Sequence, residues 1–231
     1  MNKRLLFLVL LMLSFACGRG ERLCNGDLIF VAPLLEADGM DTAIVAATGG
    51  SDSLNFTHVA IVEVQGDSVW VIDATGKRGV SRRPLEVFLE DFPQSVFAVW
   101  RVKGVDASAA VSRARSYCGR FYDYRFLPDN EDLYCSELVQ KCYLDASGAL
   151  VFPSEPMNWL APDGSLPAYW EELFHELGMD VPQGVPGTNP QKMSHSACLV
   201  PVTVRLVPPF GPNLCREICY FTRFLLFLYP G

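Results

Sequence analysis

The 231-residue chain is poor in histidine and in positive charge. It contains three histidines, so a site that needs an imidazole has few candidates. Nineteen Lys and Arg residues stand against 26 Asp and Glu residues, which gives a formal net charge of -7. Binding to a nucleic-acid backbone depends on clustered Lys and Arg, so this balance argues against a nucleic-acid partner. Half of the residues are hydrophobic and 19% are charged, which is enough for a core and excludes a disordered chain.

Long apolar runs are also absent. The first run, residues 5–13, follows two basic residues and precedes Ser14, Phe15, Ala16 and Cys17, with small residues at the cleavage point, a pattern typical of a secretory signal. It is too short to span a bilayer as a stable helix. Cys17 follows Ala16 and resembles the lipidated cysteine of bacterial lipoproteins, with ordinary cleavage as the alternative. We therefore expect a signal peptide over residues 1–17 and an exported protein of the bacterial cell envelope, anchored to the membrane through Cys17.

The chain shows no internal repeat and no linker between domains. One domain is the default at this length, and we expect it over residues 24–200. Residues 201–231 form a tail whose apolar end could be a packed helix, a membrane-surface element or a non-native tail read in another frame. Cys215 and Cys219 lack a second pair at zinc-ligand spacing, and the nearby His195 and Cys198 make only a weak metal site. The cysteine spacings define no disulfide pairing.

The stretch LYCSELVQKCY, residues 133–143, is the one around which a site can be built. Leu138, Val139 and Cys142 recur at helical spacing, which predicts a helix with one inward apolar face. Cys135 then lies in or just before the first turn, where the helix dipole favours a thiolate. A buried structural cysteine is the alternative. We interpret Cys135 as a candidate nucleophile that needs a base.

The segment THVAIVEVQGDSVWVIDATG, residues 57–76, predicts a β-hairpin. Two β-rich runs flank residues 65–68, where Gly66 can adopt a positive φ. A turn with an even number of residues places His58 and Asp73 on one face of the hairpin. They would then be diagonal neighbours with Cα atoms roughly 7–8 Å apart, within reach of a side-chain hydrogen bond. A turn with an odd number would place them on opposite faces.

A thiol, an imidazole and a group that orients the imidazole make up an activated nucleophile. His58 is the favoured base, because His175 and His195 are expected at the surface or at its boundary. A satisfied core histidine and a turn carboxylate are the alternatives for His58 and Asp73. The sequence therefore predicts a site made of Cys135, His58 and Asp73.

The remaining pattern predicts an α+β chain. Asp106 is a natural N-cap for one of the helices. Further strands are expected near residues 28–31, 79–83 and 96–102, and further helices over residues 41–48, 84–89, 107–117 and 166–177.

Five motifs occur in an order that can be compared with known families: GDLIF at 26–30, THVAIV at 57–62, VIDATG at 71–76, FYDYRF at 121–126 and YCSELV at 134–139. Together they resemble the YiiX/YebB-like cysteine hydrolases. These enzymes are circularly permuted relatives of the NlpC cell-wall peptidases, within the papain-like class. The resemblance covers about residues 25–198 and includes PQGVPGTNP at 182–190. It rests on the order, in which the histidine strand precedes the cysteine helix.

The resemblance implies a circularly permuted papain-like (NlpC-type) α+β fold, with a small antiparallel sheet packed on helices and the nucleophile at a helix N-terminus. Cys135 matches the nucleophile, His58 the base and Asp73 the orienting position. That third position is more often Glu in the family, so Asp73 is a departure. Tyr122, in the loop before the nucleophile, is a candidate assisting residue, with packing as the alternative.

The resemblance also implies an exported cysteine hydrolase that cleaves an amide or ester bond in a cell-wall peptide or an acyl amide. It implies neither a metal nor an organic cofactor. The rival interpretation is a catalytically idle ligand- or lipid-binding module on the same fold. The oligomeric state stays open.

Overall fold

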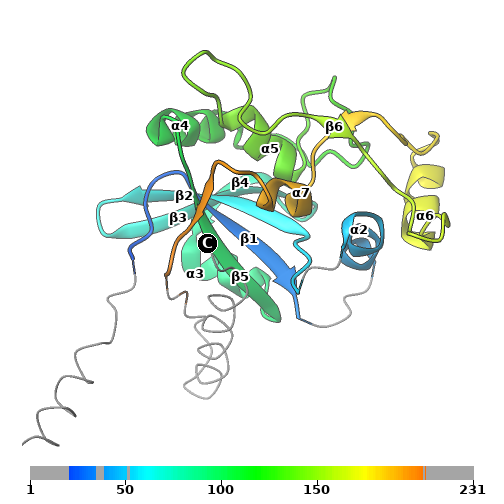
Figure 1. Cartoon of the computed structure of the whole chain (residues 1–231), viewed down its shortest axis with the longest axis horizontal. Coiled ribbons are helices and arrows are strands. Elements are labelled where there is room, and N and C mark those ends of the chain that lie inside the picture. Colours follow the sequence, from blue (N-terminus) through cyan, green and yellow to red (C-terminus); the bar gives the residue numbers. More distant parts are fainter. Residues whose placement is uncertain (1–20, 35–38, 51–52, 205, 207–231) are drawn as a thin grey trace, which may run out of the picture.

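The structure is a computed structural model that describes residues 21–34, 39–50, 53–204 and 206. A six-stranded antiparallel sheet crosses its centre in the order β4-β3-β2-β1-β5-β8 (Figure 1). Its strands are β1 Asp27–Pro33, β2 His58–Gln65, β3 Ser68–Thr75, β4 Gly79–Pro84, β5 Ser95–Val102 and β8 Leu199–Pro201. The helices of the described part are α2 Met40–Thr48, α3 Leu85–Asp91, α4 Ala107–Tyr117, α5 Cys135–Cys142, α6 Ala168–Glu176 and α7 Pro190–Ser194. The expected α+β architecture is confirmed.

The hairpin of β2 and β3 has the register that the even turn requires. Gln65 pairs with Ser68, so the turn consists of two residues, and Gly66 has a φ of 61°. Farther from the turn, Val62 pairs with Val71. A glycine is favoured where the backbone adopts this left-handed conformation.

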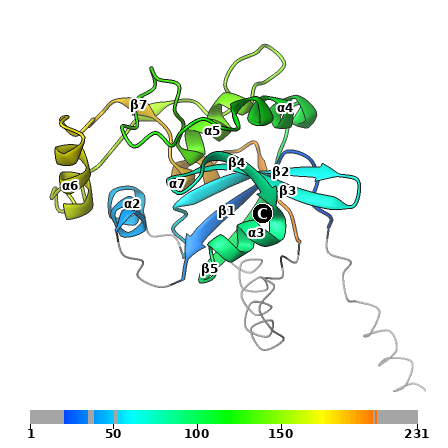
Figure 2. The same ribbon diagram turned by 180° about the vertical axis from the view of Figure 1, so that it is seen from behind.

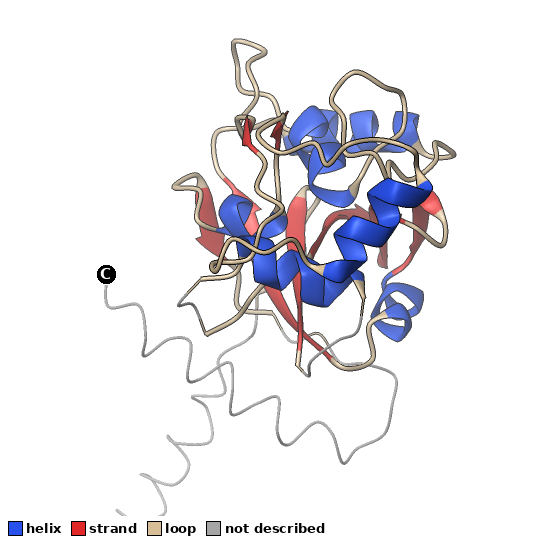
Figure 3. Ribbon diagram, turned by 90° about the vertical axis from the view of Figure 1, so that its right-hand side faces the viewer, coloured by secondary structure: helices blue, strands red, loops and turns tan. Residues whose placement is uncertain are grey.

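The sheet buries both of its faces because side chains alternate along each strand. Figures 1 and 2 show α4 and α5 on one side and α3 on the other. On the first side, α5 packs its Leu138 and Val139 against a cluster from the sheet, made by Leu28, Phe30, Val59, Ile61 and Ile72. On the second side, Phe88 and Leu89 of α3 cover Ile29, Val31, Ala60, Val62 and Val71. Figure 3 shows the layers from the side, with helices flanking the strands.

A third cluster lies beside the sheet and is mostly aromatic. Helices α2 and α6 pack together there, and the Nε1 of Trp170 donates to the carbonyl of Ala43 at 3.3 Å. Trp159 and Trp170 meet edge to face, with ring centroids 4.8 Å apart. Phe126 and Tyr134, which bracket the entry to α5, belong to the same cluster. The cluster therefore supports the chain that leads into the cysteine helix.

The expected element boundaries differ from the observed ones in a few places. Helix α6 begins at Ala168 because Pro167 occupies its N-cap with extended backbone. Helix α7 and strand β8 were not expected, nor was the separate two-stranded sheet of β6 Glu155–Pro156 and β7 Pro186–Gly187. Asp106 caps α4 as expected, since its side chain accepts from the backbone N–H of Ala109. The predicted signal peptide and nearly all of the predicted tail lie outside the described residues.

Candidate active site

Cys135 is the first residue of α5, as its sequence context predicts. Tyr134 is the N-cap and has extended backbone, so the helix begins at the cysteine itself. The N–H groups of a first helical turn have no acceptor within the helix and carry the positive end of its dipole. Cys135 is buried, with 6% of its surface exposed. Its thiol therefore lies where a negative charge on sulfur, or on an oxygen bound beside it, is stabilised.

His58 begins β2 and meets Asp73 of β3. The Nε2 of His58 lies 2.8 Å from Oδ2 of Asp73, so the predicted side-chain contact is confirmed. Asp73 is fully buried. The imidazole is stacked against Phe92 of the α3 end, with ring centroids 5.0 Å apart, which fixes the plane of the ring. Because Nε2 is bonded to the carboxylate, Nδ1 is the nitrogen left for exchange of a proton with the thiol.

Arg83 of β4 holds the other side of Asp73. Its two terminal nitrogens bond both carboxylate oxygens, one of them at 2.9 Å. The side chain of Arg83 is 6% exposed and lies over the ring of Phe88. Arg83 was not predicted from the sequence, although the second hairpin carries a signal for it. Gly79 pairs with Thr75 in the second hairpin, so its register would have placed Arg83 diagonal to Asp73 on the same face.

Burial by itself would lower the pKa of His58. Attraction to Cys135 and hydrogen bonds to Asp73 and Cys135 outweigh that effect and raise the pKa of His58 to about 10. Burial alone would raise the pKa of Asp73, yet His58 and Arg83 hold it below its usual value. The carboxylate is therefore ionised at neutral pH, and the imidazole is a cation beside the cysteine.

Tyr122 lies within electrostatic reach of Cys135 and within an aromatic group. Burial is the first cause that raises the pKa of its phenol well above the ordinary value, and Cys135 is the second. Its ring meets that of Tyr124 with centroids 4.9 Å apart, and its hydroxyl lies 3.9 Å from the sulfur of Met40. Tyr122 thus packs near the thiol as a neutral phenol. Its assisting role stays a prediction.

The loop between Tyr122 and α5 is organised by a buried carboxylate. Asp123 is 2% exposed and accepts hydrogen bonds from the backbone N–H groups of Arg125 and Leu127, each at 2.9 Å. The side-chain amide of Asn130 donates to it at 3.1 Å. A carboxylate is rarely buried inside a protein unless its oxygens accept hydrogen bonds. Asp123 therefore gives the approach to the cysteine a defined shape.

The other candidates of the sequence do not join this site. His175 is exposed on α6, and His195 is exposed at the end of α7. Cys17, Cys215 and Cys219 lie outside the described residues. Within the ranges that the structure describes, no group of three or more His, Cys, Asp or Glu side chains could hold a metal ion. Five cysteines of the same ranges, Cys24, Cys118, Cys135, Cys142 and Cys198, are free thiols.

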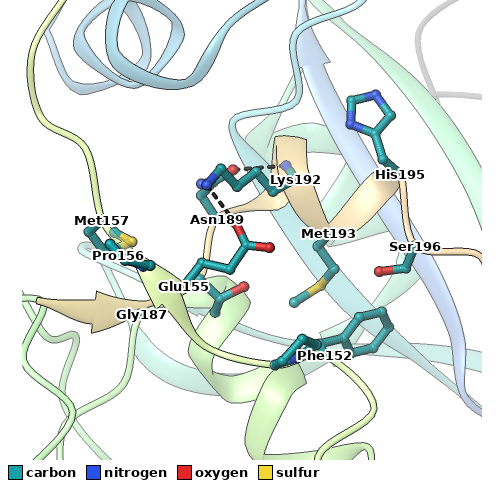
Figure 4. Close-up of a pocket in the computed structure, with 12 residues that line it drawn as sticks. Phe152, Glu155, Pro156, Met157, Gly187, Asn189, Lys192, Met193, His195 and Ser196 are labelled. Atoms are coloured by element: carbon teal, nitrogen blue, oxygen red, sulfur yellow. Dashed lines mark hydrogen bonds and ion pairs between the residues drawn. The ribbon is translucent and has the colours of Figure 1, made fainter. Parts of the chain in front are cut away.

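A pocket of about 420 Å³ lies beside α7 and is separate from Cys135, His58 and Asp73, none of which lines it (Figure 4). Its lining includes Phe152 and Met193, and the ammonium of Lys192, another lining residue, meets Glu155 at 2.6 Å. His195 also lines it. The pocket shares a wall with the active site, because Thr188 belongs to its lining and contacts the residues next to Cys135.

Comparisons with known proteins agree with the fold. Residues 22–203 match the model of a family described as "Permuted papain-like amidase enzyme, YaeF/YiiX, C92 family". The chain is 26% identical over 171 residues to the "Uncharacterized protein YiiX" of Escherichia coli K12, covering 72% of this chain and 79% of that protein. A crystal structure titled as the metalloprotein yiiX of Escherichia coli O157:H7 is similar at a TM-score of 0.62 and 24% identity. That likeness covers 80% of this chain and 98% of the other.

Proposed function

Because the chain belongs to the family of permuted papain-like amidases, and so is a papain-like cysteine hydrolase, we propose that Cys135, His58 and Asp73 form its catalytic triad. The observation that supports this most is the buried contact of 2.8 Å between His58 and Asp73, with Cys135 among the groups that raise the pKa of the histidine. A carboxylate that orients an imidazole, which in turn faces a nucleophile, is the geometry that acyl transfer requires.

The reaction follows from these positions. The thiolate of Cys135 attacks the carbonyl carbon of the substrate, a C–S bond forms, and the carbonyl oxygen becomes an oxyanion. Backbone N–H groups at the start of α5 donate to that oxyanion. His58 gives its Nδ1 proton to the leaving amine or alcohol, and the carbon–leaving-group bond breaks to give a thioester. His58 then takes a proton from water, the resulting hydroxide attacks the thioester, and the acid leaves as the thiolate re-forms.

Asp73 keeps the imidazole in one tautomer throughout. Its carboxylate accepts a hydrogen bond from the Nε2–H of His58, so Nδ1 stays directed at the thiol. Its pairing with Arg83 makes it a weak base, and the proton therefore remains on the imidazole. The crystal structure of the relative is titled a metalloprotein. The mechanism derived for the present chain uses the side chains of the triad alone.

The substrate we propose is a cell-wall peptide or an acyl amide of the bacterial envelope. The proposal rests on family membership and on the export signal of the sequence. Incubation of the mature protein with purified cell-wall fragments and with acyl-amide lipids, followed by mass spectrometry, tests it. We expect new amine and acid termini in one of the two, absent with Cys135→Ser. Cleavage of neither would contradict this substrate class.

The alternative is an idle binding module on the same fold, and thiol chemistry separates the two without a substrate. At about pH 6 an ordinary thiol is almost fully protonated. A paired Cys135 should nevertheless react with iodoacetamide faster than the other reduced cysteines. Cys142, at the other end of α5, is the internal control, because burial raises the pKa of its thiol to about 12. His58→Ala should move the labelling of Cys135 to higher pH. Equal labelling of Cys135 and Cys142 would favour the binding module.

A further inference from the structure

We propose that residues 186–191, called the brace here, set the distance between Cys135 and His58, with Gln191 as the positioning residue. The inference rests on the proposed function and concerns the end of the PQGVPGTNP motif, which the mechanism leaves unused, together with Gln191, which follows it. Cys135 begins a helix and His58 begins a strand, so no single element holds both. The brace contacts the chain on both sides.

One end of the brace is bonded to the two neighbours of Cys135. The hydroxyl of Ser136 donates to the carbonyl of Thr188 at 3.1 Å. The backbone N–H of Thr188 donates to the hydroxyl of Tyr134, also at 3.1 Å. Ser136 is fully buried and Tyr134 is 4% exposed. The backbone of one residue, Thr188, is therefore bonded to the residues immediately before and after the cysteine.

The other end is bonded to the chain that enters the histidine strand. Oε1 of Gln191 accepts from the backbone N–H of Phe56 at 2.7 Å, across 135 positions of the sequence. Both residues are buried, Gln191 at 3% and Phe56 at 6% exposure. Phe56 stands two residues before His58. A buried N–H group is costly to leave without an acceptor, so Gln191 holds the start of β2 firmly.

The sequence of the brace explains why it can reach both ends. A Cβ on Gly187 would lie 2.7 Å from the side chain of Met157 and 2.9 Å from the hydroxyl of Tyr134, so only glycine lets the brace approach the cysteine helix this closely. Asn189 caps α7 by accepting from the N–H of Lys192 at 2.9 Å, and Pro190 follows at the first helical position. Because of these two residues, α7 begins directly at Pro190.

The start of α7 decides which side chains face inward. Gln191 is buried against Phe56, while Lys192 is half exposed and pairs with Glu155. The brace thus links the nucleophile to its base through three hydrogen bonds between buried groups. An error of about 1 Å in the position of a catalytic group can cost a hundredfold in rate, so the link bears on the chemistry and not only on stability.

The test measures how fast iodoacetamide alkylates Cys135 in the full chain as a function of pH. In the wild-type protein the ion pair with His58 should give a plateau of reactivity at low pH. Gln191→Leu removes the acceptor at similar size, and we expect the plateau to fall by about ten- to a hundredfold. Reactivity at high pH, where a thiolate forms unaided, should be unchanged. Gln191→Glu keeps an acceptor oxygen and should restore most of the plateau.

Two controls separate positioning from a loss of folding. Lys192→Ala lies on the outward side of the same helix and should leave the plateau intact. Cys142 should stay unlabelled in every variant, since a structural collapse would expose it together with Cys135. If Gln191→Leu does not fold, Ser136→Ala tests the other end of the brace with the same readout. A wild-type protein without the plateau overturns the proposed function and this inference with it. A wild-type plateau that survives in Gln191→Leu, or in Ser136→Ala where that variant replaces it, overturns the brace alone.

Discussion

Asp73 is shared by two cationic groups, and this sharing defines the site at the scale of single residues. His58 approaches one of its oxygens from β2, and Arg83 approaches both from β4. A shorter carboxylate than the usual glutamate must sit closer to the imidazole, and the distance of 2.8 Å shows that it does. Removing one partner of a buried ion pair leaves the other charge uncompensated. Substitutions of Asp73 and of Arg83 should therefore have different effects, which can be compared.

The change Asp73→Asn should lower turnover by about 10⁴-fold, the scale of a wrong-tautomer substitution in a triad. The amide can donate to Nε2, which then turns the Nδ1 proton toward the thiol. Turnover and the rate of Cys135 alkylation at neutral pH measure the effect, with circular dichroism to show that the fold persists. Rates close to wild type would place the third member of the triad elsewhere.

The change Arg83→Met should destabilise the protein by about 3–5 kcal/mol, because Asp73 is left as a buried charge with one partner fewer. The pKa of Asp73 should rise toward its usual value and beyond. A carboxyl group with a lowered pKa contributes stability above its unfolded pKa and loses it as pH falls through the folded pKa. As the pH is lowered, stability and activity should therefore start to fall at a higher pH in Arg83→Met than in the wild type. This decline at low pH is called the acid limb here.

The matched control is Arg82→Met on the same strand. Arg82 is partly exposed, lies over Trp70 and pairs with Glu63 at 2.7 Å. Its removal leaves Glu63 with Arg115 as a partner, so it should destabilise the protein less than Arg83→Met and move the acid limb less. Equal shifts of the acid limb in both variants would show that Arg83 acts through net charge and not through Asp73.

At the scale of elements, the helices and strands that could be predicted from the sequence are those that a local pattern of residues determines. The hairpin carrying His58 and Asp73 has alternation and a glycine turn of its own, and α5 has helical spacing. Helix α7 and strand β8 have five and three residues, too few for a periodic signal, and their partners Phe56 and Trp100 are distant in sequence. The pair Asn189 and Pro190 was the available sign of a helix start. Arg83 was missed because no register was assigned to the second hairpin.

The loop before α5 gives a prediction at this scale. Asp123→Ala removes the acceptor of two backbone N–H groups, each of which costs about 1–3 kcal/mol if left unsatisfied in a buried place. Hydrogen exchange at Arg125 and Leu127 should accelerate, and alkylation of Cys135 should slow. Asp129→Ala, at an exposed position of the same loop, should change neither. Unchanged exchange in Asp123→Ala would mean that the aromatic cluster alone shapes the loop.

Across the whole molecule, the raised pKa of His58 should appear in the pH dependence of stability. Its pKa is 6.5 in the unfolded chain and about 10 in the fold, so the folded state binds the extra proton between these values. The stability that it contributes is complete below about pH 6.5 and is lost as pH rises toward 10. Thermal melting from pH 6 to pH 10 should show this decline in the wild type, relative to His58→Ala. Parallel curves would contradict the ion pair.

The location of the protein in the cell needs a test of its own. In the described part of the chain, no helix is long and apolar enough to cross a membrane. We propose that a lipid on Cys17 anchors the mature protein to the bacterial envelope. The protein should then partition with membranes and take up labelled fatty acid, and Cys17→Ser should abolish both. A soluble wild-type protein that begins at Gly18 or later, without acyl mass, would exclude the anchor.

The turn between β5 and α4 separates the residues of the site into two groups along the chain. His58, Asp73 and Arg83 all precede it, whereas Cys135 and the brace follow it. Gly104 in this turn is exposed and has a φ of 76°. Helix α5 packs on β2, and β8 pairs with β5, so the two parts share a large interface. Broken at this turn, the enzyme would become two fragments, one with the proton-handling groups and one with the thiol. Thiol reactivity would then report their reassembly, which makes the permuted chain order a natural design for a split reporter.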